Sequence, residues 1–420
     1  MGELKSLGKA FDISKWEVKE AWERVRANKG APGVDGCSIE DFEKDLRGNL
    51  YKIWNRMSSG SYFPPPVLAV EIPKAHGAGT RVLGVPTVAD RVAQTVVARR
   101  LEKAAEPTFH PDSYGYRPRR SALDAVAACR ERCWKSDWVI DLDIEKFFDS
   151  VPWDLVVKAV EAHIDQRWVV LYVTRWLQAP IQTSDGEIQS RERGTPQGSA
   201  VSPVLANLFL HYAFDAWMVR TFPAIPFERY VDDAVVHCTS QAQAQHVARA
   251  IGVRMEQVGL RLHPDKTRIV YCQDGKRRGV HEHAAFTFLG FTFRQRSAKD
   301  RQGRQFSAFL PAVSKAALKR LSVQVRSWRL HMRTTLTFAQ LARWVNPIVR
   351  GWMQYYGAYY RSALHRLLTR INTYLVRWIR KKYKRLRGMK SAVQCWLGIV
   401  KRHPRMFAHW TWVAAAPPAH

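Results

Sequence analysis

The sequence predicts an α+β protein whose C-terminal quarter is entirely helical and strongly basic. Helix and strand patterns alternate irregularly as far as FERYVDDAVVHC, residues 227–238, which is typical of an α+β domain. Beyond about residue 311 no strand pattern remains, and residues 311–420 contain 22 Lys and Arg but no Asp or Glu. With 420 residues, 46% of them hydrophobic, the chain is long enough for two or three domains with cores of their own.

The N-terminal part predicts helices followed by a hairpin. Apolar residues recur at helical spacing from Trp16 to Val25, and the segment NKGAPGVDG, residues 28–36, then interrupts the pattern. Residues 67–85 contain two strand patterns, VLAVEIP and TRVLGVP, joined by KAHGAGT. We therefore expect a helical extension and then a β-hairpin with a basic tip.

A short strand is expected at residues 138–143, WVIDLD, after helices at 87–103 and 122–132. Side chains alternate between the two faces of a strand, so Asp141 and Asp143 point to the same side. Two carboxylates on one strand face make this segment a candidate functional site.

The C-terminal region predicts a folded, electropositive domain. The chain carries a formal charge of +29 and has a pI near 10.2, which favours a polyanionic partner, nucleic acid in particular. Residues 311–420 are also rich in Trp and Tyr, unlike a disordered basic tail. Two apolar stripes at helical spacing predict core packing: Leu318, Leu321, Val325 and Trp328, then Trp352, Tyr355, Tyr356 and Tyr359.

The cysteines and the hydropathy pattern argue against several classes of protein. None of the six cysteines forms a CxxC pair, so no zinc module is expected. No apolar run reaches the roughly 18 to 20 residues of a membrane span, and the first ten residues lack the apolar core of a signal peptide. We expect a cytoplasmic protein, in the bacterial cytosol or associated with the nucleoid, with reduced cysteines and no membrane partner.

Asp232 and Asp233 stand side by side in a run of residues that favours burial. Adjacent aspartates on a half-buried strand repel each other and lose hydration, so the arrangement is costly unless cations offset it. The alternative is a hairpin turn with two solvated aspartates. Together with Asp143, about ninety residues earlier, the pair would form the kind of carboxylate cage that holds two Mg²⁺ ions in phosphoryl transfer, provided that their strands are neighbours.

Several motifs resemble reverse transcriptases. FERYVDDA resembles their YxDD box, DLDIEKFFDSV the preceding metal-binding motif, and RGTPQGSAVSPVLANLFL the PQG motif beside the incoming nucleotide. Group II intron-encoded reverse transcriptases and their relatives also contain, in this order, NKGAPGVDG, IPK…TRVLGVPT, YGYRPRRSALDAV, LHPDKTRIVYC and FLGFTF, and WVNPIVRGWMQYYGAYY resembles their thumb, or maturase-specific region. The resemblance to this family covers roughly residues 20–300.

The resemblance implies a right-hand polymerase fold. We expect an N-terminal extension over residues 1–60, fingers and palm over 61–310, and a helical thumb over 311–388. GMKSA interrupts the helical pattern near residue 388, and a basic nucleic-acid-binding tail would follow over 389–420.

The resemblance also assigns the metal ligands. Asp143 and Asp232 would bind both Mg²⁺ ions, Asp233 would complete the cage, and the carbonyl of Ile144 would contact the ion on the nucleotide. Mn²⁺ is a possible substitute. Asp141 is the competing candidate for the position of Asp143. A further carboxylate, Asp149, would either support the ligands or cap a helix beside Ser150.

The same resemblance assigns residues that bind the dNTP. Lys74 and Arg81 flank the hairpin tip and would close over the triphosphate, while Gln197 and Gly198 would line the nucleotide pocket. Glycine suits that position because it allows a close approach of the backbone.

Two further residues belong to this set. Phe148 would clash with a ribose 2′-OH and so favour dNTP over NTP. Lys266 would act as a general acid toward pyrophosphate or bind phosphate.

Nucleic-acid contacts are implied in four places. Arg117, Arg119 and Arg120 would contact the template backbone, and Gly290, in FLGF, belongs to a primer grip. Val231 replaces the usual alanine of intron-encoded members and would press near the primer end. A dense basic helix predicts further contacts, or else a solvated cationic face: Arg377, Arg380, Lys381, Lys382, Lys384, Arg385 and Arg387.

The expected function is that of an RNA-directed DNA polymerase that takes an RNA template, a DNA or RNA primer and dNTPs. Binding of a group II intron RNA, with assistance to its splicing, is expected as well. Two alternatives remain: a free-standing enzyme recruited for DNA repair or phage defence, and an RNA-binding maturase without polymerase activity. Beyond about residue 400 there are no cysteine pairs or His/Asn clusters for an endonuclease module.

Overall fold

The computed structural model describes residues 9–73, 79–299 and 302–413. The chain divides into two compact units, each discontinuous in sequence. The first comprises Met1–Ala125 and Ile140–Ile269, and the second comprises Val126–Val139 and Val270–His420. Lys74, at the predicted hairpin tip, lies outside the described residues.

The predicted N-terminal helices are confirmed. They are α1 (Lys15–Asn28), α2 (Ile39–Lys44) and α3 (Leu46–Ser58). α1 and α2 each begin with a capping box, in which the serine side chain and the acidic residue three positions later satisfy each other's backbone amides. α1 packs on α3 and on α4 (Val88–Ala105) through an apolar stripe, and the buried members of that stripe are Val18, Ala21, Trp22 and Val25.

The predicted hairpin at residues 67–85 is also confirmed. β1 (Val67–Pro73) and β2 (Thr80–Val85) are antiparallel, with Leu68 opposite Val85 and Ile72 opposite Arg81. β1 also pairs with the short strand β4 (Ile181–Gln182), and β5 (Ile188–Gln189) completes the sheet, in the order β2-β1-β4-β5.

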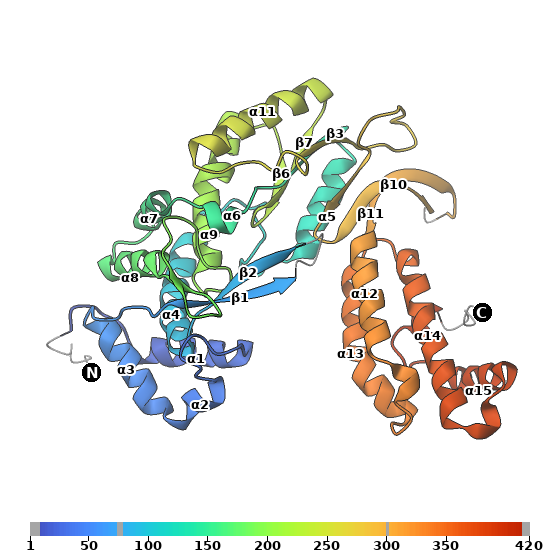
Figure 1. Ribbon diagram of the computed structural model, residues 1–420. Helices are drawn as coiled ribbons and strands as arrows, with labels where there is room; N and C mark the ends of the chain where they lie inside the picture. Colours follow the sequence, from blue (N-terminus) through green and yellow to red (C-terminus); the bar gives the residue numbers. More distant parts are fainter. Residues whose placement is uncertain (1–8, 74–78, 300–301, 414–420) are drawn as a thin grey trace, which may run out of the picture. The chain divides into compact units, whose positions relative to one another are not determined.

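A second sheet brings the two aspartate-bearing strands together. Its order is β6-β7-β3-β8, so β7 (Asp233–Cys238) is the neighbour of β3 (Trp138–Leu142) (Figure 1). β6 (Phe227–Tyr230) pairs antiparallel with β7, and the last pair joins Tyr230 to Asp233. Only Val231 and Asp232 are left to make the turn. The edge strand is β8 (Arg268–Tyr271).

The remaining elements up to residue 257 are helices. One of them contains a π-helical turn, η1 (His211–Asp215), which continues α9 (Ser202–Leu210) into α10 (Ala216–Thr221). Such turns are rare and often lie at functional sites. The others are α5 (Ala122–Cys133), α6 (Phe147–Ser150), α7 (Trp153–Glu161), α8 (Arg167–Gln178) and α11 (Gln241–Gln257).

The second unit contains a three-stranded antiparallel sheet in the order β11-β10-β9. Its strands are β9 (Ala285–Phe288), β10 (Phe291–Lys299) and β11 (Gln305–Val313). Helices then follow as predicted, although β11 runs slightly past residue 311. They are α12 (Lys315–Ser327), η2 (Leu330–Met332), α13 (Phe338–Tyr356), α14 (Ser362–Lys382), η3 (Lys384–Leu386), α15 (Met389–Arg402) and α16 (Trp410–Val413).

A single hydrophobic cluster runs through these helices. It extends from Val313 to Val413 and includes buried residues on both sides of residue 388, among them Trp378 and Trp396. The predicted apolar stripe is part of it: Leu321, Val325 and Trp328 are buried. Among the described residues, no helix is both long and apolar enough to cross a membrane.

Candidate active site

The structure brings Asp143, Asp232 and Asp233 together in the first unit. Asp143 directly follows β3, Asp232 lies in the β6–β7 turn, and Asp233 begins β7. Loss of hydration and the neighbouring charge of Asp143 raise the pKa of Asp232. The pKa of Asp233 rises to about 7, because of lost hydration and the charges of Asp232 and Asp143. Burial and the charge of a nearby carboxylate both raise a carboxyl pKa, as expected for closely spaced aspartates.

Asp141 joins this group as a fourth carboxylate. Burial raises its pKa to about 7, with further contributions from Asp233 and Asp143, while Arg268 opposes the shift. The two strand residues that the sequence left in competition therefore both face the cluster. A concentration of negative charge in oxygen ligands suits a hard divalent cation such as Mg²⁺.

Lys266 already places a positive charge in the cluster. Its Nζ lies 2.6 Å from Oδ2 of Asp143, although its side chain is 62% exposed. The backbone explains the approach, because the amide of His263 donates to the carbonyl of Asp143 (2.8 Å). Thr267 Oγ1 lies 3.3 Å from both the amide nitrogen and the carbonyl oxygen of Asp143. The HPDKT segment is thus fastened to the end of β3, and a cation is stabilised beside Asp143.

The backbone beyond Asp143 suits the role predicted for Ile144. Ile144 forms an antiparallel bridge with Leu262, and the hydrogen bonds of this bridge use the carbonyl of Asp143 and the amide of Glu145. The bridge therefore leaves the carbonyl of Ile144 on the other side of the strand. Lys146 then adopts a left-handed conformation, with φ 45°, and redirects the chain into α6.

Val231 adopts an unfavourable backbone conformation in the β6–β7 turn. Its φ is 60°, which is rare for a β-branched residue. Its side chain is buried, and Gly115 packs so closely that an added Cβ there would lie 2.5 Å from Val231 Cγ2. The Val231 side chain thus packs against the protein interior, and its effect on the primer end stays a prediction.

A buried arginine, which the sequence analysis missed, stabilises this turn. Arg229 is 1% exposed and donates to the carbonyl of Val231 (2.9 Å). Its guanidinium also donates to both carboxylate oxygens of Asp215, to Asn207 Oδ1 (3.2 Å) and to Ser113 Oγ (2.8 Å). Asp215 ends the π-helical turn. The one available signal was an arginine within a buried strand pattern, since burying a charge requires partners.

Two of the predicted nucleotide-binding residues line one cavity. Phe148 and Gln197 face a space of about 290 Å³ that Val82 and Gly84 of β2 also line. Arg81 is exposed on β2 next to Val82. Arg81, Phe148 and Gln197 thus belong to the same region of the first unit.

The fold itself requires a glycine at position 198. Its φ is 120°, and an added Cβ would lie 2.6 Å from the carbonyl oxygen of Gly84. The amide of Gly84 donates to the carbonyl of Gln197 (2.8 Å). The close approach expected for this glycine is therefore made to β2, and it holds the PQG segment against the hairpin.

A second buried network anchors the residues after the PQG motif. Ser199 Oγ and the amide of Ala200 each donate to Gln94 Oε1 (2.8 Å), and Gln94 Nε2 donates to Asp90 (2.8 Å). Asp90 also accepts hydrogen bonds from Tyr62 and Trp176. Burial raises the pKa of Asp90 to about 6.

Asp149 lines the same 290 Å³ cavity as Phe148. The structure does not support its capping alternative, because Lys146 and Pro152 are the N-cap residues of α6 and α7. Asp149 lies within α6, and its side chain is exposed.

The predicted template contacts divide into two groups. Arg117 needs correction, because its side chain is only 5% exposed and forms an ion pair with Glu106 at 2.9 Å. Its guanidinium also donates to the carbonyls of His110 and Ser113. Arg119 and Arg120 are exposed and remain candidates.

Gly290 lies in the second unit, in the turn between β9 and β10. Leu289 and Gly290 both have positive φ, 50° and 81°, as in a type I′ hairpin turn. The hydroxyl of Tyr355 donates to the carbonyl of Leu289 (2.8 Å). Tyr356 packs against Gly290, where an added Cβ would lie 3.3 Å from its ring.

The basic helix also contains two kinds of residue. Arg380 donates to the carbonyl of Arg387, and Lys382 donates to the carbonyl of Leu336 and lies over the Trp378 ring. Both are half-buried. The five exposed members of the predicted set are Arg377, Lys381, Lys384, Arg385 and Arg387.

Comparison with known proteins agrees with this arrangement. Residues 72–293 match the family "Reverse transcriptase (RNA-dependent DNA polymerase)", and residues 318–396 match "Group II intron, maturase-specific domain". Protein YkfC of Escherichia coli K12 is 31% identical over 317 residues, which are 65% of this chain and 79% of YkfC.

Two relatives carry intron names. The group II intron-encoded protein LtrA of Lactococcus lactis is 29% identical over 193 residues, 46% of this chain and 32% of LtrA. A putative COX1/OXI3 intron 1 protein of Saccharomyces cerevisiae is 28% identical over 198 residues, 47% of this chain and 23% of that protein. The chain thus spans about a third of the length of LtrA and less of the yeast protein.

The reverse transcriptase match covers more than half of the chain, and the similarity to YkfC extends over most of that protein. The chain therefore belongs to the reverse transcriptase family, the RNA-dependent DNA polymerases, and carries a group II intron maturase-specific domain.

Proposed function

We propose that this protein extends a DNA or RNA primer with dNTPs on an RNA template by two-metal phosphoryl transfer. The observation that carries the proposal is the convergence of Asp141, Asp143, Asp232 and Asp233 beside the ammonium of Lys266, where burial and the charge of Asp143 raise the pKa values of Asp141, Asp232 and Asp233. Four carboxylates at such density are unfavourable without cations.

The residues that would hold two Mg²⁺ ions are Asp143, Asp232 and Asp233, with the carbonyl of Ile144 beside them. When bound, the ions neutralise charge on the phosphoryl oxygens during the displacement. Mn²⁺ would bind the same oxygen ligands. Asp141, on the same strand face, would add negative charge to the group when it is ionised, although burial and the charges of Asp233 and Asp143 raise its pKa to about 7.

The protein's own side chains would position the nucleotide. Arg81 would neutralise the triphosphate from β2, and Gln197 would fix the nucleotide in the cavity that it lines with Phe148. The Phe148 ring would exclude a ribose 2′-OH by its bulk. Lys266, which lies beside Asp143, would bind a phosphate oxygen or donate a proton to the departing pyrophosphate.

We further propose that the second unit binds a group II intron RNA and assists its splicing. This rests on the maturase-specific match over residues 318–396 and on the excess of positive charge beyond Asp300, the last acidic residue of the chain. The positive charge supplies affinity for phosphates that does not depend on sequence.

Primer extension by Asp232→Asn tests the polymerase assignment. The substitution removes one carboxylate charge with little change in shape, and we expect at least a thousandfold loss of Mg²⁺-dependent dNTP incorporation, with nucleic-acid affinity nearly unchanged. Asp185→Asn is the matched control, because Asp185 is exposed in the β4–β5 loop. Extension by Asp232→Asn at the rate of this control would remove the assignment.

A further inference from the structure

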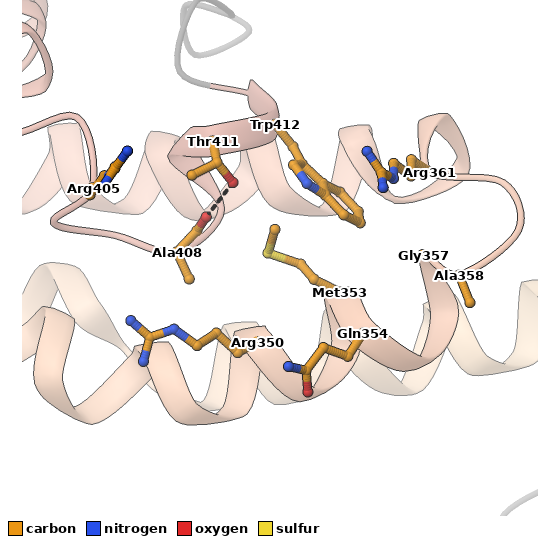
Figure 2. Close-up of a pocket in the computed structure, with 10 residues that line it drawn as sticks. All are labelled: Arg350, Met353, Gln354, Gly357, Ala358, Arg361, Arg405, Ala408, Thr411 and Trp412. Carbon is orange, nitrogen blue, oxygen red and sulfur yellow. Dashed lines mark hydrogen bonds between the residues drawn. The ribbon is translucent and has the colours of Figure 1, made fainter. Parts of the chain in front are cut away.

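A pocket of about 490 Å³ in the second unit contains features that the polymerase site does not use. It lies between α13 and the segment that leads into α16, and its volume is that of a small-ligand site. The residues that line it include Arg350, Met353, Gly357, Arg361, Arg405 and Trp412 (Figure 2).

The wall of this pocket is fixed by buried asparagines. Asn346 of α13 donates to the carbonyl of Met406 and accepts from the amide of Ala408, both at 2.8 Å. Asn372 of α14 accepts hydrogen bonds from His409 (2.8 Å) and from the Trp410 indole (2.9 Å). Asn346 thus holds the backbone at residues 406 and 408, and Asn372 holds the side chains of the next two residues, so this segment is pre-organised.

The floor of the pocket is apolar and aromatic. The Trp412 indole lies so close to the end of α13 that a Cβ added at Gly357 would overlap its ring. In Figure 2 the Met353 thioether and the Trp412 ring lie in the middle of the pocket, between the arginines. Trp412 is half-buried, so part of its ring remains accessible.

The rim of the pocket is cationic. Arg350, Arg361 and Arg405 are all exposed, and in Figure 2 Arg350 and Arg405 lie toward one end of the pocket and Arg361 toward the other. The guanidinium of Arg361 lies 5.1 Å from the centre of the Trp412 ring. Because the chain has no Asp or Glu after Asp300, no nearby acid in sequence offsets these charges.

We propose that this pocket is a nucleotide-binding subsite for single-stranded nucleic acid. One base would lie on the Trp412 and Met353 floor, and the phosphates on either side of it would bind Arg350, Arg361 and Arg405. An aromatic platform between cations is the usual means of holding an unpaired nucleotide. The pocket rests on the proposed function, RNA binding by the second unit. RNA binding alone requires only a positive surface, whereas the pocket would hold one nucleotide at a defined place.

The first test compares two triple variants of the full-length protein with the same change in charge. One is Arg350→Gln, Arg361→Gln, Arg405→Gln. The control is Arg343→Gln, Arg366→Gln, Arg370→Gln, at exposed positions of α13 and α14 outside the pocket. Affinity for fluorescent 12-nucleotide RNA and DNA of one sequence is measured by anisotropy. We expect the pocket variant to bind about tenfold more weakly and the control less than threefold. Equal losses would show a diffuse field and overturn the proposal.

The second test asks whether a base is bound. The wild type should bind an RNA 12-mer at least about fivefold more tightly than an abasic strand of equal length. Trp412→Ala should abolish this preference, and Trp412→Phe should retain part of it. If inorganic tripolyphosphate competes as well as the RNA at equal charge, or if Trp412→Ala keeps the preference, the site recognises phosphate alone and the proposal fails.

A crosslinking measurement covers the case in which Trp412→Ala does not fold. RNA that contains 4-thiouridine, irradiated with the wild-type protein, should attach to peptides that contain Met353 or Trp412. Crosslinks confined to other peptides would refute the proposal. Primer extension by Asp232→Asn is scored separately, so a failure of the pocket and a failure of the polymerase assignment give different results.

Discussion

The guanidinium of Arg229 donates hydrogen bonds to both carboxylate oxygens of Asp215, at 2.7 and 2.5 Å, with neither side chain exposed. This bidentate pair connects the π-helical turn to the β6–β7 turn, because Arg229 also donates to the carbonyl of Val231. A planar fork fixes orientation in a way that a lysine ammonium cannot.

Arg229→Lys should therefore impair catalysis through the position of Asp232. The charge stays but the fork is removed, and we expect the single-turnover extension rate at saturating dNTP to fall about 10- to 100-fold. The Mg²⁺ concentration for half-maximal rate should rise, while the KM for dNTP changes little. Arg254→Lys is the control, because Arg254 donates to the π-helix carbonyls of Tyr212 and Ala213 rather than to the turn. A lower melting temperature with an unchanged rate would contradict a positioning role.

Gly115→Ala should disrupt the same turn from outside. The new Cβ would lie 2.5 Å from Val231 Cγ2 and 2.7 Å from the Val231 amide nitrogen, so both side chain and backbone must move. We expect destabilisation of about 1–3 kcal/mol, as is usual for an overpacked core, measured by urea unfolding. Adding Val231→Ala removes the side-chain clash but not the backbone clash, so the double variant should recover only part of the loss. Full recovery would show that the backbone contact is unimportant.

The raised pKa of Asp90 should make the stability of the protein depend on pH. Its pKa is raised to about 6 in the folded protein, whereas an aspartate in the unfolded chain titrates near 4. Between these values the folded state binds the proton more tightly, so this group lowers the free energy of unfolding as the pH rises through its folded pKa of about 6, and the loss is complete about one pH unit higher.

Asp90→Asn removes this titration. Between pH 5 and pH 7 the wild type should lose on the order of 1 kcal/mol more unfolding free energy than the variant does. Urea unfolding of both proteins at the two pH values measures the difference. The comparison cancels all other titrating groups, so the absolute destabilisation of Asp90→Asn does not affect it. Equal pH dependence in the two proteins would contradict the assignment.

Exposed and half-buried basic residues of α14 and η3 should differ in their effects on RNA binding and on stability. Replacing the exposed set, Arg377, Lys381, Lys384, Arg385 and Arg387, with Gln should weaken RNA binding and reduce the slope of log affinity against log salt by about 0.7 for each phosphate that the protein no longer neutralises. Replacing Arg380 and Lys382, which donate to backbone carbonyls, should instead lower the melting temperature. An unchanged salt slope in the first variant would show that this face does not meet the phosphates.

The sequence predicted the elements whose local pattern is strong. The hairpin at residues 67–85 and the alternation in WVIDLD both appear as strands, because turn residues and a two-residue period specify them locally. The β10–β11 hairpin was not predicted. In β11 several consecutive residues are buried, so the alternation typical of a half-exposed strand is absent there.

The contacts that support the site could not be predicted from a single sequence. Asp143, Asp232 and Asp233 could be singled out because paired carboxylates in apolar surroundings need an explanation. Arg229 meets Asp215 at the end of a π-helical turn, residues 211–215, and nothing in HYAFD shows that turn. Arg117 was misassigned for a similar reason, because its partner Glu106 lies eleven residues earlier in a separate element.

The second unit begins within α5, since residues 126–139 belong to it together with residues 270–420. Trp134 donates to the carbonyl of Phe309, and Arg277 donates to the carbonyls of Cys133 and Ser136. No single break in the gene can therefore separate the two units intact. A fragment that starts at residue 270 would lack the partners of Phe309 and Arg277, so the maturase-specific portion is best studied by substitution within the whole chain.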